Sequence, residues 1–266
     1  MTNATLIDQD LVERVLAAAS ARGGDFAETF VEDRHTNSAM LDQRRIEELT
    51  SGRERGAGIR VVIGETTGFA HTADLTERGL LKAAEAAAAV ARSGGGGTKT
   101  VALESFRNHA TRATELPHDV DKARKVEMML LADDIARSQG SAISQVQVGL
   151  GDTSRRFLVA NTDGVFAGDH QVRTRFNVQT VAVGDTGMQT GYRPVAATRG
   201  FEWMTPERIT EAASKAAQQA LTKLGSRPAP SGDLPVVLAG GSGGILFHEA
   251  CGHGRSEEHT SELQSH

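Results

Sequence analysis

The sequence has little of the material that several classes of protein require. Among its 266 residues there is one cysteine, Cys251, so no internal disulfide can form, which fits a reducing compartment. Aromatic residues make up only 4% of the chain, too few to stack against the bases of single-stranded nucleic acid. Because the net charge is −5 and no basic block stands out, we expect no nucleic-acid partner.

Long apolar runs are missing as well. The longest candidate, residues 83–91, is interrupted by Glu85 and falls short of the roughly 20 residues that cross a bilayer. Residues 1–10 have neither the basic start nor the apolar centre of a signal peptide. These absences predict a soluble, cytoplasmic protein with no membrane partner.

What the chain does contain predicts a mixed α/β (α+β) fold that begins with an N-terminal unit over residues 1–92. Apolar residues at helical spacing and short alternating runs indicate two helices that flank three strands. We expect helices at 6–21 and 76–92 and strands at 26–33, 58–63 and 67–71. Thr76 is suited to be the N-cap of the second helix.

A second α/β unit is expected over residues 119–225. Between the units, 93–118 is predicted to be a linker and loop, because its Gly-rich start cannot pack a core. In the second unit we expect helices at 121–138 and 205–224 and strands at 143–150, 157–160 and 172–183. No repeat with a period of 20–50 residues is visible.

A third domain is predicted to begin at residues 232–254, after the Pro- and Gly-containing boundary 225–232. Residues 234–239 (LPVVLA) form a short apolar run that is typical of a buried strand, 240–244 (GGSGG) form a turn, and a helix follows. A nucleotide-binding α/β protein is a competing interpretation of this Gly-rich turn. It is disfavoured, because neither a Lys–Ser/Thr pair nor a complete G-x-G-x-x-G is present.

This last helix carries His248, Glu249 and His253 in the pattern H-E-x-x-x-H. Two imidazoles suit Zn²⁺, and a carboxylate beside them can serve as general base on a metal-bound water. On a regular helix, histidines five positions apart point about 140° away from one another. We therefore predict a π-turn between them, eased by Gly252. The alternative is a pair of helix-terminal histidines that only cap the helix or form hydrogen bonds.

The segment SGDLPVVLAGGSGGILFHEACGHG resembles the zinc-binding segment of peptidases of the TldD/PmbA family. Residues 53–69 (RERGAGIRVVIGETTGF) and 161–164 (NTDG) are similar to earlier regions of that family, and the resemblance extends over residues 25–254. It implies two α/β units followed by a β-rich catalytic domain. It also implies a homodimer, or a heterodimer with a PmbA-like subunit.

By this resemblance, His248 and His253 would bind zinc, and Glu249 would activate water to hydrolyse unfolded or modified peptides. The family's third ligand is a downstream cysteine, which has no counterpart here, since Cys251 occupies a variable position inside the motif. The competing interpretation is a non-catalytic, PmbA-like partner subunit that acts through a dimer interface and substrate channel. Such subunits lack the H-E-x-x-x-H.

Residues 255–266 (RSEEHTSELQSH) match the translation of a common sequencing-library adapter. We therefore expect a non-native tail after a truncated catalytic domain, and a polypeptide that is inactive as written. A genuine polar helical tail is the alternative.

The remaining histidines show no ligand spacing and are predicted to be structural or exposed; they are His35, His71, His109, His118 and His170. The pair Asp133–Asp134 is predicted to lie on a solvated helix face.

Overall fold

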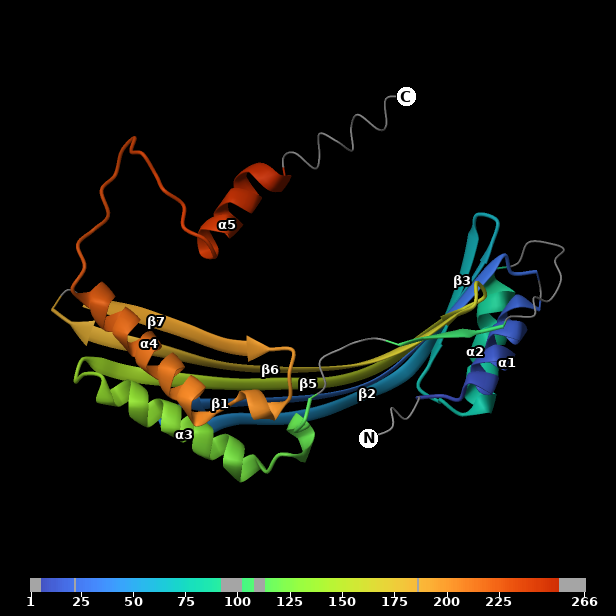
Figure 1. Cartoon of the computed structure of the whole chain (residues 1–266), viewed down its shortest axis with the longest axis horizontal. Helices are drawn as coiled ribbons and strands as arrows, with labels where there is room; N and C mark the ends of the chain where they lie inside the picture. Colours follow the sequence, from blue (N-terminus) through green and yellow to red (C-terminus); the bar gives the residue numbers. More distant parts are fainter. Residues whose placement is uncertain (1–5, 22, 92–101, 108–112, 186, 254–266) are drawn as a thin grey trace. The chain divides into compact units, whose positions relative to one another are not determined.

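A seven-stranded sheet runs through the first of two units into which the chain divides, Met1–Ser226. The computed structural model describes residues 6–253 except 22, 92–101, 108–112 and 186 (Figure 1). Most of the predicted linker and the whole tail from 254 onward therefore lie outside the described residues. The predicted mixed α/β fold is confirmed, whereas the domain boundaries stay a prediction.

The first unit contains four α-helices and seven strands among its described residues. Its helices are α1 (Gln9–Ser20), α2 (Glu77–Val90), α3 (Lys122–Ser138) and α4 (Pro206–Leu224). Its strands are β1 (Phe26–Asp42), β2 (Arg45–Ile63), β3 (Thr66–Thr72), β4 (Glu104–Arg107), β5 (Ile143–Asn161), β6 (Val165–Gly184) and β7 (Gly187–Ala197). No described helix is long and apolar enough to cross a membrane.

The four helices of the first unit lie within their predicted ranges and Thr76 caps α2 as predicted, but the strands are longer than expected. Thr76, Asp121 and Thr205 each accept a backbone N–H at the start of α2, α3 and α4. The runs predicted at 143–150 and 157–160 are one continuous strand, β5. The short strand β4, inside the predicted loop, pairs in parallel with β6 and was not predicted.

The sheet order is β3-β2-β1-β5-β6-β4, and β7 also pairs with β6. β1 and β5 pair antiparallel along almost their whole length, from Glu28 opposite Asn161 to Asp42 opposite Gln147. The two predicted α/β units therefore contribute strands to one shared sheet. In Figure 1, α3 and α4 lie at one end of the long strands and α1 and α2 at the other.

The first unit contains an internal repeat that is longer than the periods considered for the sequence. Both halves run helix, three antiparallel strands, helix: α1-β1-β2-β3-α2 and α3-β5-β6-β7-α4. The buried positions of the closing helices have the same spacing. They are Leu80, Ala83, Ala84, Ala87 and Ala88 in α2, and Ile209, Ala212, Ala213, Ala216 and Ala217 in α4. Because β1 and β5 are equivalent and antiparallel, the halves are related by a local two-fold axis.

Each closing helix packs directly on a glycine of the outer strand in its half. A Cβ built on Gly68 of β3 would lie 2.0 Å from the Ala87 carbonyl oxygen, and one on Gly191 of β7 would lie 1.9 Å from that of Ala216. Those two alanines are equivalent in the repeat. The close approach of helix and strand therefore depends on the absence of a side chain at both glycines.

Both hydrophobic cores lie on the same face of the sheet. Buried side chains occupy odd positions in β1, such as Val31 and Leu41, and even positions in β6, such as Phe166 and Phe176. Val31 and Phe166 belong to the core under α1 and α2, whereas Leu41 and Phe176 belong to the core under α3 and α4. Since alternate residues of a strand point to opposite faces, α1, α2, α3 and α4 all pack on one face, and the other face carries none of these four helices.

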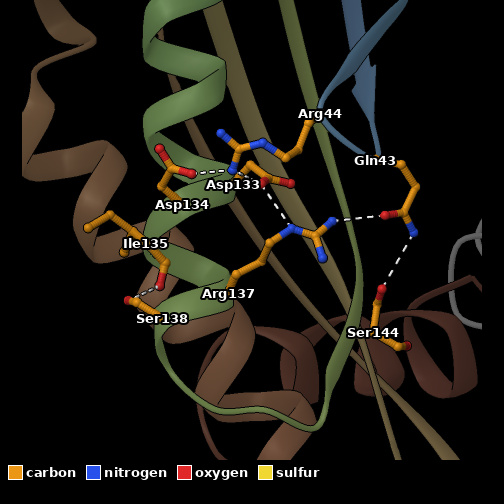
Figure 2. Close-up of polar contacts among 8 residues, drawn as sticks. All are labelled: Gln43, Arg44, Asp133, Asp134, Ile135, Arg137, Ser138 and Ser144. Carbon is orange, nitrogen blue, oxygen red and sulfur yellow. Dashed lines mark hydrogen bonds and ion pairs between the residues drawn. The ribbon is translucent and has the colours of Figure 1, made fainter.

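The β1–β2 connection is fastened to α3 by a polar network (Figure 2). Its two central residues, Gln43 and Arg44, have φ of 48° and 65°, a conformation that costs free energy in residues other than glycine. Arg44 Nη1 lies 3.2 Å from Asp133 Oδ2 and also pairs with Asp134. Arg137 Nε donates to the same Asp133 oxygen at 2.9 Å, and its Nη2 donates to Gln43 Oε1 at 3.0 Å. These contacts hold the strained turn against the helix.

The prediction of a solvated Asp133–Asp134 face is wrong for Asp133. Its side chain has no exposed surface, whereas that of Asp134 is 58% exposed. Two guanidinium groups, those of Arg44 and Arg137, contact Asp133 Oδ2 and offset the cost of burying the charge.

The second unit, described from Arg227 to His253, contains α5 (Ser242–Phe247) and a π-helical turn, His248–Gly252. The predicted buried strand at 234–239 is wrong. These residues form no strand or other regular secondary structure, and Val236 and Val237 are 74% and 95% exposed. No described strand pairs with them, and an apolar run needs a sheet neighbour to be buried as a strand.

Gly191→Ala should lower the free energy of unfolding by about 3 kcal/mol, because the added methyl group meets a backbone carbonyl of α4 that cannot move alone. Urea denaturation measures the change. Gly151→Ala is the matched control, since a Cβ there meets nothing within 4 Å, and it should change stability by less than about 0.5 kcal/mol. Equal effects of the two substitutions would contradict the packing described.

Asp133→Ala should cost about 2 kcal/mol of stability, because it removes the buried carboxylate that holds Arg44 and Arg137. The exposed neighbour supplies the control: Asp134→Ala should cost less than about 1 kcal/mol, as is usual for surface ion pairs. Chemical denaturation of both variants tests this, and a larger loss for Asp134→Ala would count against the network.

Candidate metal centre

The candidate site forms where α5 changes its hydrogen-bonding pattern. α5 spans six residues and passes directly into the π-helical turn His248–Gly252, whose closing backbone bond runs from the His253 N–H to the His248 carbonyl. The π-turn predicted from the five-residue spacing is confirmed. The extra residue in the turn offsets the rotation that would send the two histidines to different sides of a regular helix.

The π-turn brings three potential ligands together. The ring centroids of His248 and His253 are 4.6 Å apart, with the rings inclined at 64°. One ligand atom each from His248, Glu249 and His253 can be chosen so that all three lie within 4.8 Å of one another. Glu249 Oε2 is 3.5 Å from His253 Nε2. All three residues predicted from the motif are therefore adjacent in space.

Gly252 contributes through its lack of a side chain. A Cβ at this position would lie 3.1 Å from His248 Nδ1, tighter than almost all real contacts of that kind. The glycine thus leaves room for the His248 ring beside the turn, a role that the sequence did not show.

This donor set fits a zinc ion. Two nitrogen ligands at about 2.0–2.1 Å from a tetrahedral zinc lie roughly 3.4 Å from one another, so small rotations of the side chains would suffice. Such rotations are open to these residues, because the side chains of Glu249 and His253 are 62% and 61% exposed. Cys251 is exposed and does not belong to the group. No other set of His, Cys, Asp and Glu in the described part of the chain meets the same criterion.

Three of the remaining histidines, which were predicted to be structural or exposed, lie close together. The rings of His35 and His118 stack with centroids 5.0 Å apart, and His170 Nε2 lies 2.9 Å from Ser154 Oγ. Burial lowers the pKa of His35 and of His170, and the nearby His118 lowers both further. The lowered pKa values mean that this packing disfavours the protonated forms of His35 and His170.

The register of β1, β5 and β6 places two members of this cluster, and His118 joins them from a 3₁₀ turn, Pro117–Asp119. His35 lies opposite Ser154, and His170 lies opposite Arg156, one strand further along the sheet. His35 and His170 are far apart in sequence, so their proximity could not be predicted without knowing the strand register. His71 lies elsewhere, against Phe69, and His109 is outside the described residues.

Two family models match the chain. The model described as PmbA/TldA metallopeptidase domain 1 matches residues 27–91, and the model described as PmbA/TldA metallopeptidase central domain matches residues 115–224. The two matches fall on the two halves of the internal repeat.

Curated proteins with similar sequences are described as metalloproteases. A metalloprotease TldD homolog of Haemophilus influenzae is 28% identical over 261 residues, which cover 96% of this chain and 54% of that protein. A metalloprotease of Methanothermobacter thermautotrophicus is 27% identical over 249 residues, covering 93% and 54%. The chain thus spans about half the length of the curated relatives it matches.

Solved structures share the fold. A Thermotoga maritima protein described as a candidate modulator of DNA gyrase superimposes with a TM-score of 0.67 at 20% identity, over 84% of this chain and 50% of that one. TldE from Thermococcus kodakarensis gives a TM-score of 0.60 at 14% identity, over 79% and 47%.

Proposed function

The chain belongs to the PmbA/TldD metallopeptidase family, and we propose that it is part of a zinc-dependent peptidase acting on unfolded or modified peptides. The observation that carries the proposal is the π-turn, which gathers His248, Glu249 and His253 within 4.8 Å. A pair of histidines that only capped a helix would not need this distortion. Metalloprotease relatives along nearly the whole chain support the same chemistry.

In this proposal the two histidines hold the metal through ring nitrogens. Bound zinc supplies Lewis acidity, which favours loss of a proton from water and polarises a peptide carbonyl. Glu249 accepts the proton as general base and can return it to the leaving amine. Its carboxylate lies beside the ligands rather than in a separate part of the site, as this role requires.

Two histidines are fewer protein ligands than a catalytic zinc site ordinarily has, which is three. We therefore propose that the third ligand, a cysteine in the family, comes from sequence beyond this chain, and that these 266 residues alone are inactive. The proposal includes a cytoplasmic homodimer, or a heterodimer with a PmbA-like subunit. A purely non-catalytic subunit is disfavoured by the preserved H-E-x-x-x-H.

The chain should bind zinc weakly, with a dissociation constant on the order of micromolar, because only part of the ligand set is present. Titration with a zinc-sensitive competitor dye measures it. His248→Ala and His253→Ala should each weaken binding at least about tenfold, whereas Cys251→Ser should leave it unchanged. Loss of binding in Cys251→Ser, or unchanged binding in both histidine variants, would reject the ligand assignment.

In a protein that extends this chain to the length of its relatives, Glu249→Gln should retain zinc but lose peptide cleavage by about a hundredfold or more. The substitution keeps the size of the side chain and removes its capacity to accept a proton. Metal content by elemental analysis and cleavage of a labelled unfolded peptide separate the two effects. Cleavage at the parent rate with zinc bound would refute the role of Glu249.

A further inference from the structure

The face of the sheet opposite the helices carries arginines of two kinds. Most are paired with a carboxylate on the same face: Arg60 lies 2.7 Å from Glu28, Arg34 pairs with Glu54, and Arg155 pairs with Glu32. These pairs neutralise most of the charge on this face.

Arg173 and Arg175 are different. They lie two residues apart on β6 and are exposed, on the side opposite the buried Thr174. Arg175 Nη2 donates to the Tyr192 hydroxyl at 2.8 Å, and Arg173 Nη2 donates to Gln171 Oε1 at 3.5 Å, so these recorded partners are neutral. No carboxylate of the described residues lies within ion-pair distance of either guanidinium.

The two arginines border a hollow of about 590 Å³. Its lining includes Thr36, Gly151, Thr153, Arg173 and Arg175. It also includes Asp152, whose buried carboxylate is paired with Lys125. Space above the strand comes from the small residues, since a Cβ on Gly151 would meet nothing within 4 Å. Threonine hydroxyls at the rim add neutral hydrogen-bond donors beside the two cations.

The internal repeat shows that the fold itself does not require these arginines. Gly191 lies opposite Thr180, and its equivalent Gly68 lies opposite Val61. Arg173 and Arg175 precede Thr180 by the same numbers of residues, seven and five, as Glu54 and Gly56 precede Val61. Arg173 and Arg175 are therefore equivalent in the repeat to Glu54 and Gly56. The equivalent positions line a hollow of about 370 Å³ in the first half. The same architecture therefore exists with an acidic residue and a glycine in place of the two cations.

We propose that Arg173 and Arg175 form a binding site for a carboxylate of the peptide substrate. The planar guanidinium matches a carboxylate in a two-pronged hydrogen bond, and side chains two residues apart on a strand, about 7 Å, can converge on one ligand. This inference rests on the proposed function only in taking the ligand to be a peptide. The carboxylate comes from the C-terminus or from an acidic side chain.

The test uses the complete 266-residue chain, a chelator to remove metal, and fluorescence anisotropy with labelled unstructured peptides at 0.15 M salt. Three peptides share one sequence: one has a free C-terminus, one a C-terminal amide, and one an amide with a single internal Gln→Glu change. The free-acid or the Glu peptide should bind about tenfold more tightly than the neutral amide. Whichever of the two does so identifies the source of the carboxylate.

Arg173→Gln/Arg175→Gln should abolish that preference, and Arg173→Lys/Arg175→Lys should restore part of it. Arg34→Gln/Arg60→Gln is the matched control: it removes the same charge from the same face and should keep the preference. Circular dichroism melting shows that each variant is folded. Equal binding of all three peptides, or a preference that survives the Arg173/Arg175 double Gln variant, overturns the proposal. Because metal is absent throughout, failure here leaves the Glu249 and zinc experiments untouched.

Discussion

The alternation of side chains along the shared long strands is the constraint from which the rest of the first unit follows. β1, β5 and β6 each contribute buried side chains to both hydrophobic cores. A one-residue shift in their pairing would therefore turn these side chains toward the wrong face in both cores. Buried side chains lie at odd positions from Val31 to Leu41 in β1 and at even positions from Phe166 to Phe176 in β6. For this reason α1, α2, α3 and α4 cover the same face of the sheet. The other face carries exposed side chains, which include apolar ones such as Phe30 and Met40 as well as the arginines of the proposed carboxylate site.

The two halves of the repeat share the packing of their closing helices on glycine but differ in the residues that their opening helices bury. The closing helices keep small residues against Gly68 and Gly191, because helix and strand backbones approach too closely for anything larger. The opening helices are less alike: by the spacing of their buried residues, Val12 of α1 corresponds to Lys125 of α3. Lys125 Nζ lies 2.8 Å from Asp152 Oδ2, and both side chains are buried. The second half thus contains a buried ion pair at a position where the first has an apolar contact.

Local features of the chain could be predicted from the sequence, and features that depend on register could not. N-caps such as Thr76 and the turn at 64–65 are encoded by a few neighbouring residues, and the π-turn follows from the spacing of His248 and His253. The true length of β5, the histidine cluster and the contact of Asp133 with Arg44 depend on partners far away in sequence. The repeat was hidden because its halves match in burial pattern rather than in residue identity. The exposed run at 234–239 shows the converse, since an apolar pattern cannot form a strand without a sheet neighbour.

Under the two proposals made above, peptide binding and hydrolysis would depend on separate parts of the chain. Every residue of the two hydrophobic cores, and of the side chains packed against them, lies between Leu6 and Leu224, so the sheet and its open face are held together without the metal motif. His248, Glu249 and His253, by contrast, lie on two short helical turns in which no described residue is buried. A catalytic metal site needs ligands fixed by packing and by surrounding hydrogen bonds. The described residues supply ligands in the right order and at the right spacing, but none of these ligands is buried by packing. The peptide recognition proposed for the first unit would not depend on how firmly they are held.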